Sequence, residues 1–108
     1  MRRVIIESPY TGDIDRNTTY ARRAVADSLA RDEAPLASHL LYTQAGILDD
    51  DNPDDRKKGI NAGLAWGPAA DATVVYIDYG FTDGMHEGMA RARAEGRPIE
   101  FRHIGDNQ

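Results

Sequence analysis

The sequence contains no cysteine, which excludes disulfides, thiolate metal sites and a cysteine nucleophile. No apolar run is long enough to span a membrane, and the two arginines near the N-terminus lead into an expected strand instead of the apolar segment of a signal peptide. The Gly-rich lysine loop that P-loop nucleotide hydrolases require is missing as well. These absences predict a cytoplasmic protein with no membrane partner.

Basic residues are few: 13 Lys and Arg stand against 18 Asp and Glu, which gives a net charge of −5. Proteins that bind a nucleic-acid duplex normally present a basic face, so we expect no such partner, whereas a small ligand remains compatible with an acidic chain. The 108 residues suffice for one domain, which we place at residues 1–104, followed by a C-terminal tail at 105–108.

Short apolar runs alternate with helical patterns along the chain. We expect strands at 4–6, 36–38, 73–77 and 99–104, and helices at 16–31, 40–43, 53–66 and 82–95. The helix starts carry capping signals, with Asp15 or Asn17 at the first, Asn52 before Pro53 at the third and Thr82 at the last. This order predicts a three-layer α/β domain of the flavodoxin-like or Rossmann-like type, with a small parallel sheet of four to five strands.

Periodicity also predicts which side chains face the core. The last strand alternates Ile99, Phe101 and His103 with Glu100 and Arg102, which is typical of a half-exposed edge strand. The helical residues expected to face inward are Ala21, Ala24, Val25, Ser28, Leu29, Ile60, Leu64, Met85, Met89 and Ala92.

A Gly-rich turn at residues 78–84 follows the strongest expected strand and opens a helix. Ligands bind at such points in open α/β sheets, because strand carboxyl ends and helix N-termini converge there. Asp78 is expected to point into the pocket, where its carboxylate can accept ribose hydroxyls or act as base or nucleophile. Gly80 and Gly84 allow close backbone approach to a ligand, and the alternative is a structural aspartate in an ordinary turn.

A second polar loop follows the first expected strand at the same sheet edge. Ser8, Pro9 and Tyr10 can hold a sugar hydroxyl or stack on a base, or they form a turn whose tyrosine covers the core edge. Asn17 and Tyr20 lie one helical turn apart at a helix start, where the backbone N–H groups can bind a phosphate or carboxylate. The alternative is that Asn17 caps the helix and Tyr20 is a surface residue.

Two further residues are candidates for the pocket. Glu87, in the first turns of the last helix, either reaches the pocket or pairs with Arg91 four residues on. His39 follows the expected second strand and is the histidine best placed to line the site. The aspartates around residue 50 match an acidic helix start better than a calcium loop, and the three histidines are scattered, so we expect no metal and no cofactor.

Taken together, these motifs resemble the nucleoside 2-deoxyribosyltransferase-like superfamily, and they are also similar to those of small phage and prophage proteins. The matching segments are Glu7-Ser8-Pro9-Tyr10, Ala70 to Val75, Asp78 to Gly84, and Ala92 to Ile99.

The resemblance implies cleavage or transfer at the N-glycosidic bond of a nucleoside or nucleoside monophosphate. It implies a glutamate nucleophile on the helix after the Gly turn, Tyr10 as its orienting residue and Asp78 as an assisting acid. Counted from Gly84, however, the nucleophile position is Gly88, so Glu87 stands one residue early and is rotated by about 100° around the helix. Either Glu87 serves, or Asp78 does, or the chain is a non-catalytic nucleotide-binding protein, a ligand sponge or regulator.

The sequence also predicts the protein's assembly and the residues that contact the ligand. A homo-oligomer is expected, since related proteins complete their pockets from a neighbouring subunit, with Trp66 and Tyr42 as candidate interface aromatics. A purely structural domain is the remaining alternative. The residues expected to bind substrate are Ser8, Pro9, Asn17, Tyr20, His39, Gly80, Thr82, Asp83, Gly84 and Met85.

Overall fold

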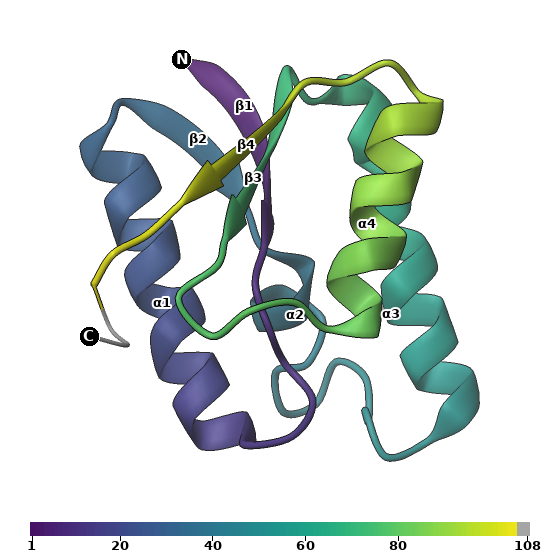
Figure 1. The fold of residues 1–108 in the computed structure, drawn as a ribbon. Coiled ribbons are helices and arrows are strands. Elements are labelled where there is room, and N and C mark those ends of the chain that lie inside the picture. The colour runs from purple at the N-terminus through teal and green to yellow at the C-terminus, as the bar shows by residue number, and fades with distance from the viewer. Residues whose placement is uncertain (106–108) are drawn as a thin grey trace.

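Four parallel strands form one sheet in the order β2-β1-β3-β4, with helices on both faces (Figure 1). The computed structural model describes residues 1–105, so the expected tail lies outside the described residues apart from Gly105. Helix α1 covers one face, and α3 and α4 lie on the other (Figure 1). The elements are β1 (Arg2–Glu7), α1 (Ile14–Ala30), β2 (Glu33–Leu36), α2 (Ser38–Leu41), α3 (Pro53–Ala65), a 3₁₀ turn (Gly67–Ala69), β3 (Ala72–Tyr76), α4 (Asp83–Ala94) and β4 (Ile99–Arg102). This architecture confirms the expected three-layer α/β fold.

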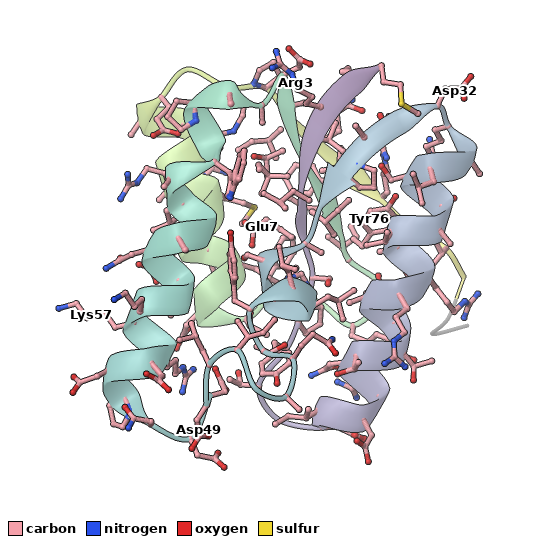
Figure 2. All side chains as sticks on the ribbon, turned by 180° about the vertical axis from the view of Figure 1, so that it is seen from behind. Arg3, Glu7, Asp32, Asp49, Lys57 and Tyr76 are labelled. Atoms are coloured by element: carbon pink, nitrogen blue, oxygen red, sulfur yellow. The ribbon has the colours of Figure 1, made fainter. Side chains whose placement is uncertain are left out.

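Strand residues alternate between two cores. Val74 and Tyr76 of β3 pack in the cluster beneath α1, whereas Val75 packs with Met85 and Met89 of α4. Glu7 of β1 is the register partner of Val75 and therefore faces the α4 side. Figure 2 shows Glu7 and Tyr76 on opposite sides of the sheet, Glu7 towards α3 and α4 and Tyr76 towards α1.

Several helix ends form as the sequence predicts. The Asn52 side chain accepts from the amides of Asp54 and Asp55 at the start of α3. Thr82 caps α4 by accepting from the Met85 amide. Helix α1 differs: it begins two residues before the expected start, and Asp13 caps it in place of Asp15 or Asn17.

Some expected inward-facing side chains lie at the surface. Leu29 and Ile60 are 51% and 42% exposed, and α3 contains no buried residue. In β4 the expected pattern is reversed, because Phe101 is 53% exposed whereas Arg102 is buried. Strand β2 begins at Glu33, three residues before the expected start.

Arg102 is buried because it is part of an ion pair across the α1 side of the sheet. Its two terminal nitrogens donate to the two Glu33 carboxylate oxygens at 2.7 Å each, and both side chains are less than 10% exposed. Ser28 of α1 donates to the same carboxylate at 2.8 Å, and Tyr76 lies 3.2 Å from the guanidinium. The Arg102 hydrogen bonds lower the pKa of Glu33 to about 2. The pair thus connects β2 with β4, the two outer strands of the sheet.

Among residues 1–105, no helix has both the length and the apolar character that a membrane crossing requires.

Candidate functional site

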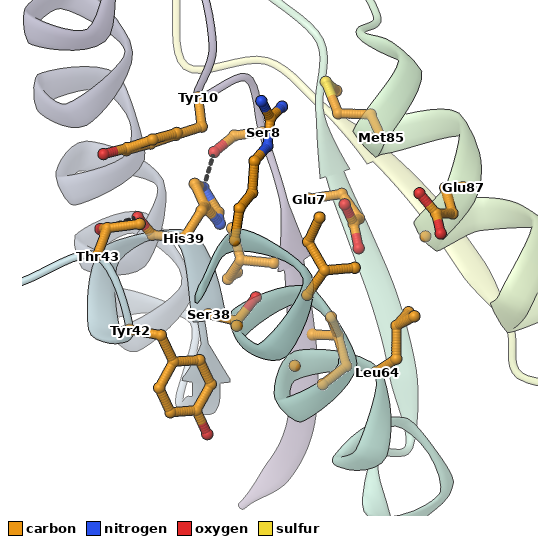
Figure 3. A pocket seen from close by; sticks show the side chains of 18 of the residues that line it. Glu7, Ser8, Tyr10, Ser38, His39, Tyr42, Thr43, Leu64, Met85 and Glu87 are labelled. Atoms are coloured by element: carbon orange, nitrogen blue, oxygen red, sulfur yellow. Dashed lines mark hydrogen bonds between the residues drawn. The ribbon is translucent and has the colours of Figure 1, made fainter. Parts of the chain in front are cut away.

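A cavity opens at the carboxyl end of β1, between the sheet and helices α2, α3 and α4 (Figure 3). The loop after β1 forms one wall and the first turns of α4 form another. The lining includes these residues of the two expected loops and of α2: Ser8, Tyr10, Thr11, Ser38, His39, Tyr42, Thr82, Gly84, Met85 and Glu87. It also includes Glu7, Gly88 and Arg97, together with Asp55, Arg56, Gly59, Ile60, Gly63 and Leu64 of α3. The expected pocket at this sheet edge is therefore present.

Two of the carboxyl groups that line this cavity, those of Glu7 and Glu87, come from β1 and α4. Glu7 ends β1 and Glu87 projects from α4, and Figure 3 shows their side chains next to each other. Burial, opposed by the lowering effect of Arg97 and assisted by the charge of Glu87, raises the pKa of Glu7 to about 8. Glu7 is therefore largely protonated at neutral pH. The sequence left open that Glu87 pairs with Arg91. In the structure Arg91 instead forms an ion pair with Glu95, at 3.8 Å.

A serine–histidine pair lines the wall formed by β1 and α2. Ser8 Oγ and His39 Nε2 are 2.6 Å apart (Figure 3). Burial lowers the pKa of His39 to about 4, so its ring is neutral at physiological pH. A neutral imidazole can orient the serine hydroxyl towards a bound ligand as donor or acceptor. The sequence prediction that Ser8 and His39 share the pocket agrees with this placement.

Asp78 lies elsewhere, in contrast to the expectation that it points into the pocket. Its Oδ1 accepts from the Tyr20 hydroxyl at 2.6 Å and from the Ile104 amide at 2.9 Å, and its Oδ2 accepts from the Gly105 amide at 2.8 Å. Burial alone would raise the pKa of Asp78, but these hydrogen bonds hold it below its usual value. The carboxylate therefore ties the turn after β3 to the segment after β4, on the α1 side of the sheet.

We expect Asp78→Asn to lower the free energy of unfolding by about 1.5–3 kcal/mol, the usual worth of hydrogen bonds to a charged group. The amide keeps the shape but loses the charge and one acceptor. Urea unfolding at pH 7 measures this, and Asp83→Asn, at an exposed position outside the cavity lining, is the control. Equal stability of the wild type and the Asp78 variant would contradict the structural role.

Asn17 and Tyr20 are buried, and their side chains form hydrogen bonds with the loops next to the cavity. The Asn17 amide donates to the carbonyls of Tyr10 and Thr11 at 3.0 Å each, which holds the loop after β1 against α1. The Tyr20 hydroxyl binds Asp78, and its ring packs edge-on against Tyr79 at 4.9 Å. Both side chains thus position the loops around the cavity.

The remaining expected binding residues divide by position. Thr82, Gly84 and Met85 line the cavity. The expected residues that do not line it are Pro9, Asn17, Tyr20, Asp78, Gly80 and Asp83. Gly80 has a φ of 78°, which a residue with a side chain rarely adopts, so it is needed for the turn.

Glu7 and the α3 residues line the cavity although the sequence motifs did not predict a role for them. The alternation of Val4 and Ile6 with Ile5 and Glu7 carried the signal for Glu7, since it places Glu7 on the opposite face from the α1 core. Residues 1–105 contain no group of three or more histidine, aspartate or glutamate side chains that could hold a metal ion.

The fold matches solved structures of nucleoside-processing enzymes. A 2-deoxyribosyltransferase from Bacillus psychrosaccharolyticus has a TM-score of 0.66 at 14% identity, over 94% of this chain and 72% of that one. A 2-deoxyribosyltransferase from Leishmania mexicana has a TM-score of 0.61 at 17% identity, over 95% of this chain and 65% of that one. A CMP N-glycosidase from Clostridium botulinum has a TM-score of 0.55 at 12% identity, over 94% and 71%. No curated protein matches significantly by sequence.

These similarities define the class: the chain has the nucleoside 2-deoxyribosyltransferase-like fold, as the sequence motifs predicted. Within that class, the chain belongs to the family described as a domain of unknown function, DUF7768, whose profile matches residues 2–102.

Proposed function

We propose that this protein cleaves or transfers the N-glycosidic bond of a nucleoside or nucleoside monophosphate. The observation that carries the proposal is the position of Glu87 in a cavity at the carboxyl edge of the sheet, with Tyr10 on the same cavity's wall. The solved structures of similar fold include two deoxyribosyltransferases and an N-glycosidase, which supports this reaction class.

The cavity supplies groups suited to such a substrate. Glu87 is the carboxylate proposed to attack the anomeric carbon, which would form a covalent sugar intermediate that water or a second base then resolves. The hydroxyls of Ser8, Tyr10 and Thr82 are available for the sugar or its phosphate, and Ser8 is already oriented by His39. Asp78 drops out of the proposed catalytic group, because its carboxylate is bound on the other side of the sheet.

The assembly proposed for the protein remains a homo-oligomer. Trp66 is 52% exposed, and its indole N–H donates to the hydroxyl of Tyr42, a residue that lines the cavity, at 2.9 Å. A second copy packed on this aromatic pair would extend the cavity wall.

The test is incubation with a panel of nucleosides and deoxynucleoside monophosphates, followed by mass spectrometry for free base. We expect release from at least one substrate, and a loss of at least about 100-fold in Glu87→Gln, since removing a nucleophile eliminates the covalent route. Glu100→Gln, a carboxylate outside the cavity lining, is the matched control and should keep the wild-type rate.

The second candidate, a non-catalytic nucleotide binder, is favoured by glycine at position 88, where the resemblance implies a glutamate. In that case no substrate would release free base. A nucleotide would instead survive intact and raise the melting temperature, as any ligand that binds only the folded state does.

A further inference from the structure

Glycine at position 88 creates space for a carboxyl group from another element. Gly88 lies inside α4, where glycine is unfavourable, and its φ is not positive, so backbone conformation does not require it. A Cβ added at this position would lie 2.5 Å from Cδ of Glu7 and 2.8 Å from its Oε1. Any other residue would therefore displace the Glu7 carboxyl group.

The Glu7 carboxyl group has no structural partner within residues 1–105, where no hydrogen bond or ion pair involves it. Arg97, the cation that lowers the pKa of Glu7, donates from Nε to Thr73 at 2.9 Å and from Nη1 to Glu95 at 2.7 Å. A half-buried carboxyl group without a partner is costly to folding. Glu7 lies in the cavity wall beside Glu87, so a role in the site accounts for a carboxyl group that does not stabilise the fold.

Two carboxyl groups in different surroundings can divide the work of glycoside chemistry, one carrying a proton while the other is ionised. The raised pKa of Glu7 supports its being the protonated one. The other charged or titratable side chains that line the cavity are Tyr10, His39, Tyr42, Asp50, Asp55, Arg56, Glu87 and Arg97.

We infer that Glu7 is the general acid and base of the reaction and that Gly88 is present to admit it; this rests on the proposed function. As the Glu87 oxygen bonds to the anomeric carbon and the C–N bond breaks, Glu7 gives its proton to the leaving base nitrogen. Water then bonds to the anomeric carbon and gives a proton to Glu7 while the Glu87 ester bond breaks. The products are free base and sugar, and both carboxyl groups return to their starting state.

The experiment compares Glu7→Gln, Glu87→Gln and the control Glu100→Gln on two substrates: the nucleoside cleaved by the wild type, and the p-nitrophenyl glycoside of the same sugar. The p-nitrophenolate leaving group needs no proton. We expect Glu7→Gln to slow nucleoside cleavage by about 10²–10⁴-fold and the first-turnover release of p-nitrophenol by less than about tenfold. Glu87→Gln should lose both activities, and the alkaline limb of the wild-type pH profile should vanish in Glu7→Gln.

Two results would overturn the inference while the proposed function stands: a Glu7→Gln enzyme that cleaves the nucleoside at the wild-type rate, or one that loses both substrates equally. Covalent labelling of Glu7 by a 2-fluoro sugar would likewise overturn it, because Glu7 would then be the nucleophile. A wild type that cleaves neither substrate would reject the proposed function itself. Urea unfolding of each variant confirms that the folded protein is being compared.

Discussion

Arg102→Met is expected to destabilise the protein by about 3–5 kcal/mol, the usual cost of breaking a buried ion pair by removing one partner. The change leaves the Glu33 carboxylate buried with the Ser28 hydroxyl and the exposed Arg2 guanidinium at 3.1 Å as its contacts. It also removes the connection between the two outer strands. Urea unfolding followed by circular dichroism at pH 7 measures the loss.

The double variant Glu33→Met/Arg102→Met separates the buried charge from packing. Once both charges are gone, no uncompensated ion remains, so we expect the double variant to be more stable than Arg102→Met alone. Glu100→Gln, which removes a more exposed partner of Arg102, should cost less than about 1 kcal/mol. The single variant Glu33→Met completes the cycle: if its loss and that of Arg102→Met simply add in the double variant, the two charges are not coupled and the interpretation is wrong.

Glu7→Gln is expected to stabilise the protein at alkaline pH, by up to about 4 kcal/mol at pH 9. The folded state raises the pKa of Glu7 from 4.5 to about 8, so folding favours the protonated form. Its contribution to stability is therefore complete below pH 4.5 and is lost as the pH rises through about 8. Glutamine stays neutral throughout and avoids this loss.

The measurement is the free energy of unfolding of both proteins in urea at pH 4.5 and pH 9. The two should agree closely at pH 4.5 and diverge at pH 9, with the variant the more stable. Glu33 changes in the opposite sense, since its stabilisation is present above pH 4.5 and is lost as the pH falls towards 2. A variant no more stable than the wild type at pH 9 would show that Glu7 is not held in a desolvating site.

The burial of Arg102, Glu33 and Glu7 could not be predicted from the local sequence pattern. Short β-branched runs and helix caps identified the elements correctly, because they act locally: Asn52 and Thr82 bind amides within three residues of themselves. The partner of Arg102, by contrast, is 69 residues away. A charged residue in a short strand looks exposed unless its distant partner is known.

The sequence predicted a pocket at the carboxyl edge of the sheet, where the structure has a cavity, but it did not predict on which side of the sheet Glu7 and Asp78 lie. Glu7 is the last residue of β1, Asp78 lies two residues beyond β3, and both side chains carry a carboxyl group. They differ in which face they occupy, and this depends on the alternation of residues in each strand. Val74 and Tyr76 beneath α1 place Asp78 on that side, whereas Glu7 shares the side of Val75. The alternation of residues in β1 and β3 therefore predicts that Glu7 and Asp78 lie on opposite sides of the sheet.

Helix α3 forms a wall of the cavity, yet it has no buried residue. The folding core is thus made almost entirely by β1, β3, α1 and α4. Substitutions at Arg56 and Ile60, which are exposed on α3 and line the cavity, are expected to reshape the space around a ligand at little cost to folding. If the proposed function holds, these positions of α3 are where substrate preference can diverge during evolution, while the carboxyl groups on β1 and α4 stay in place.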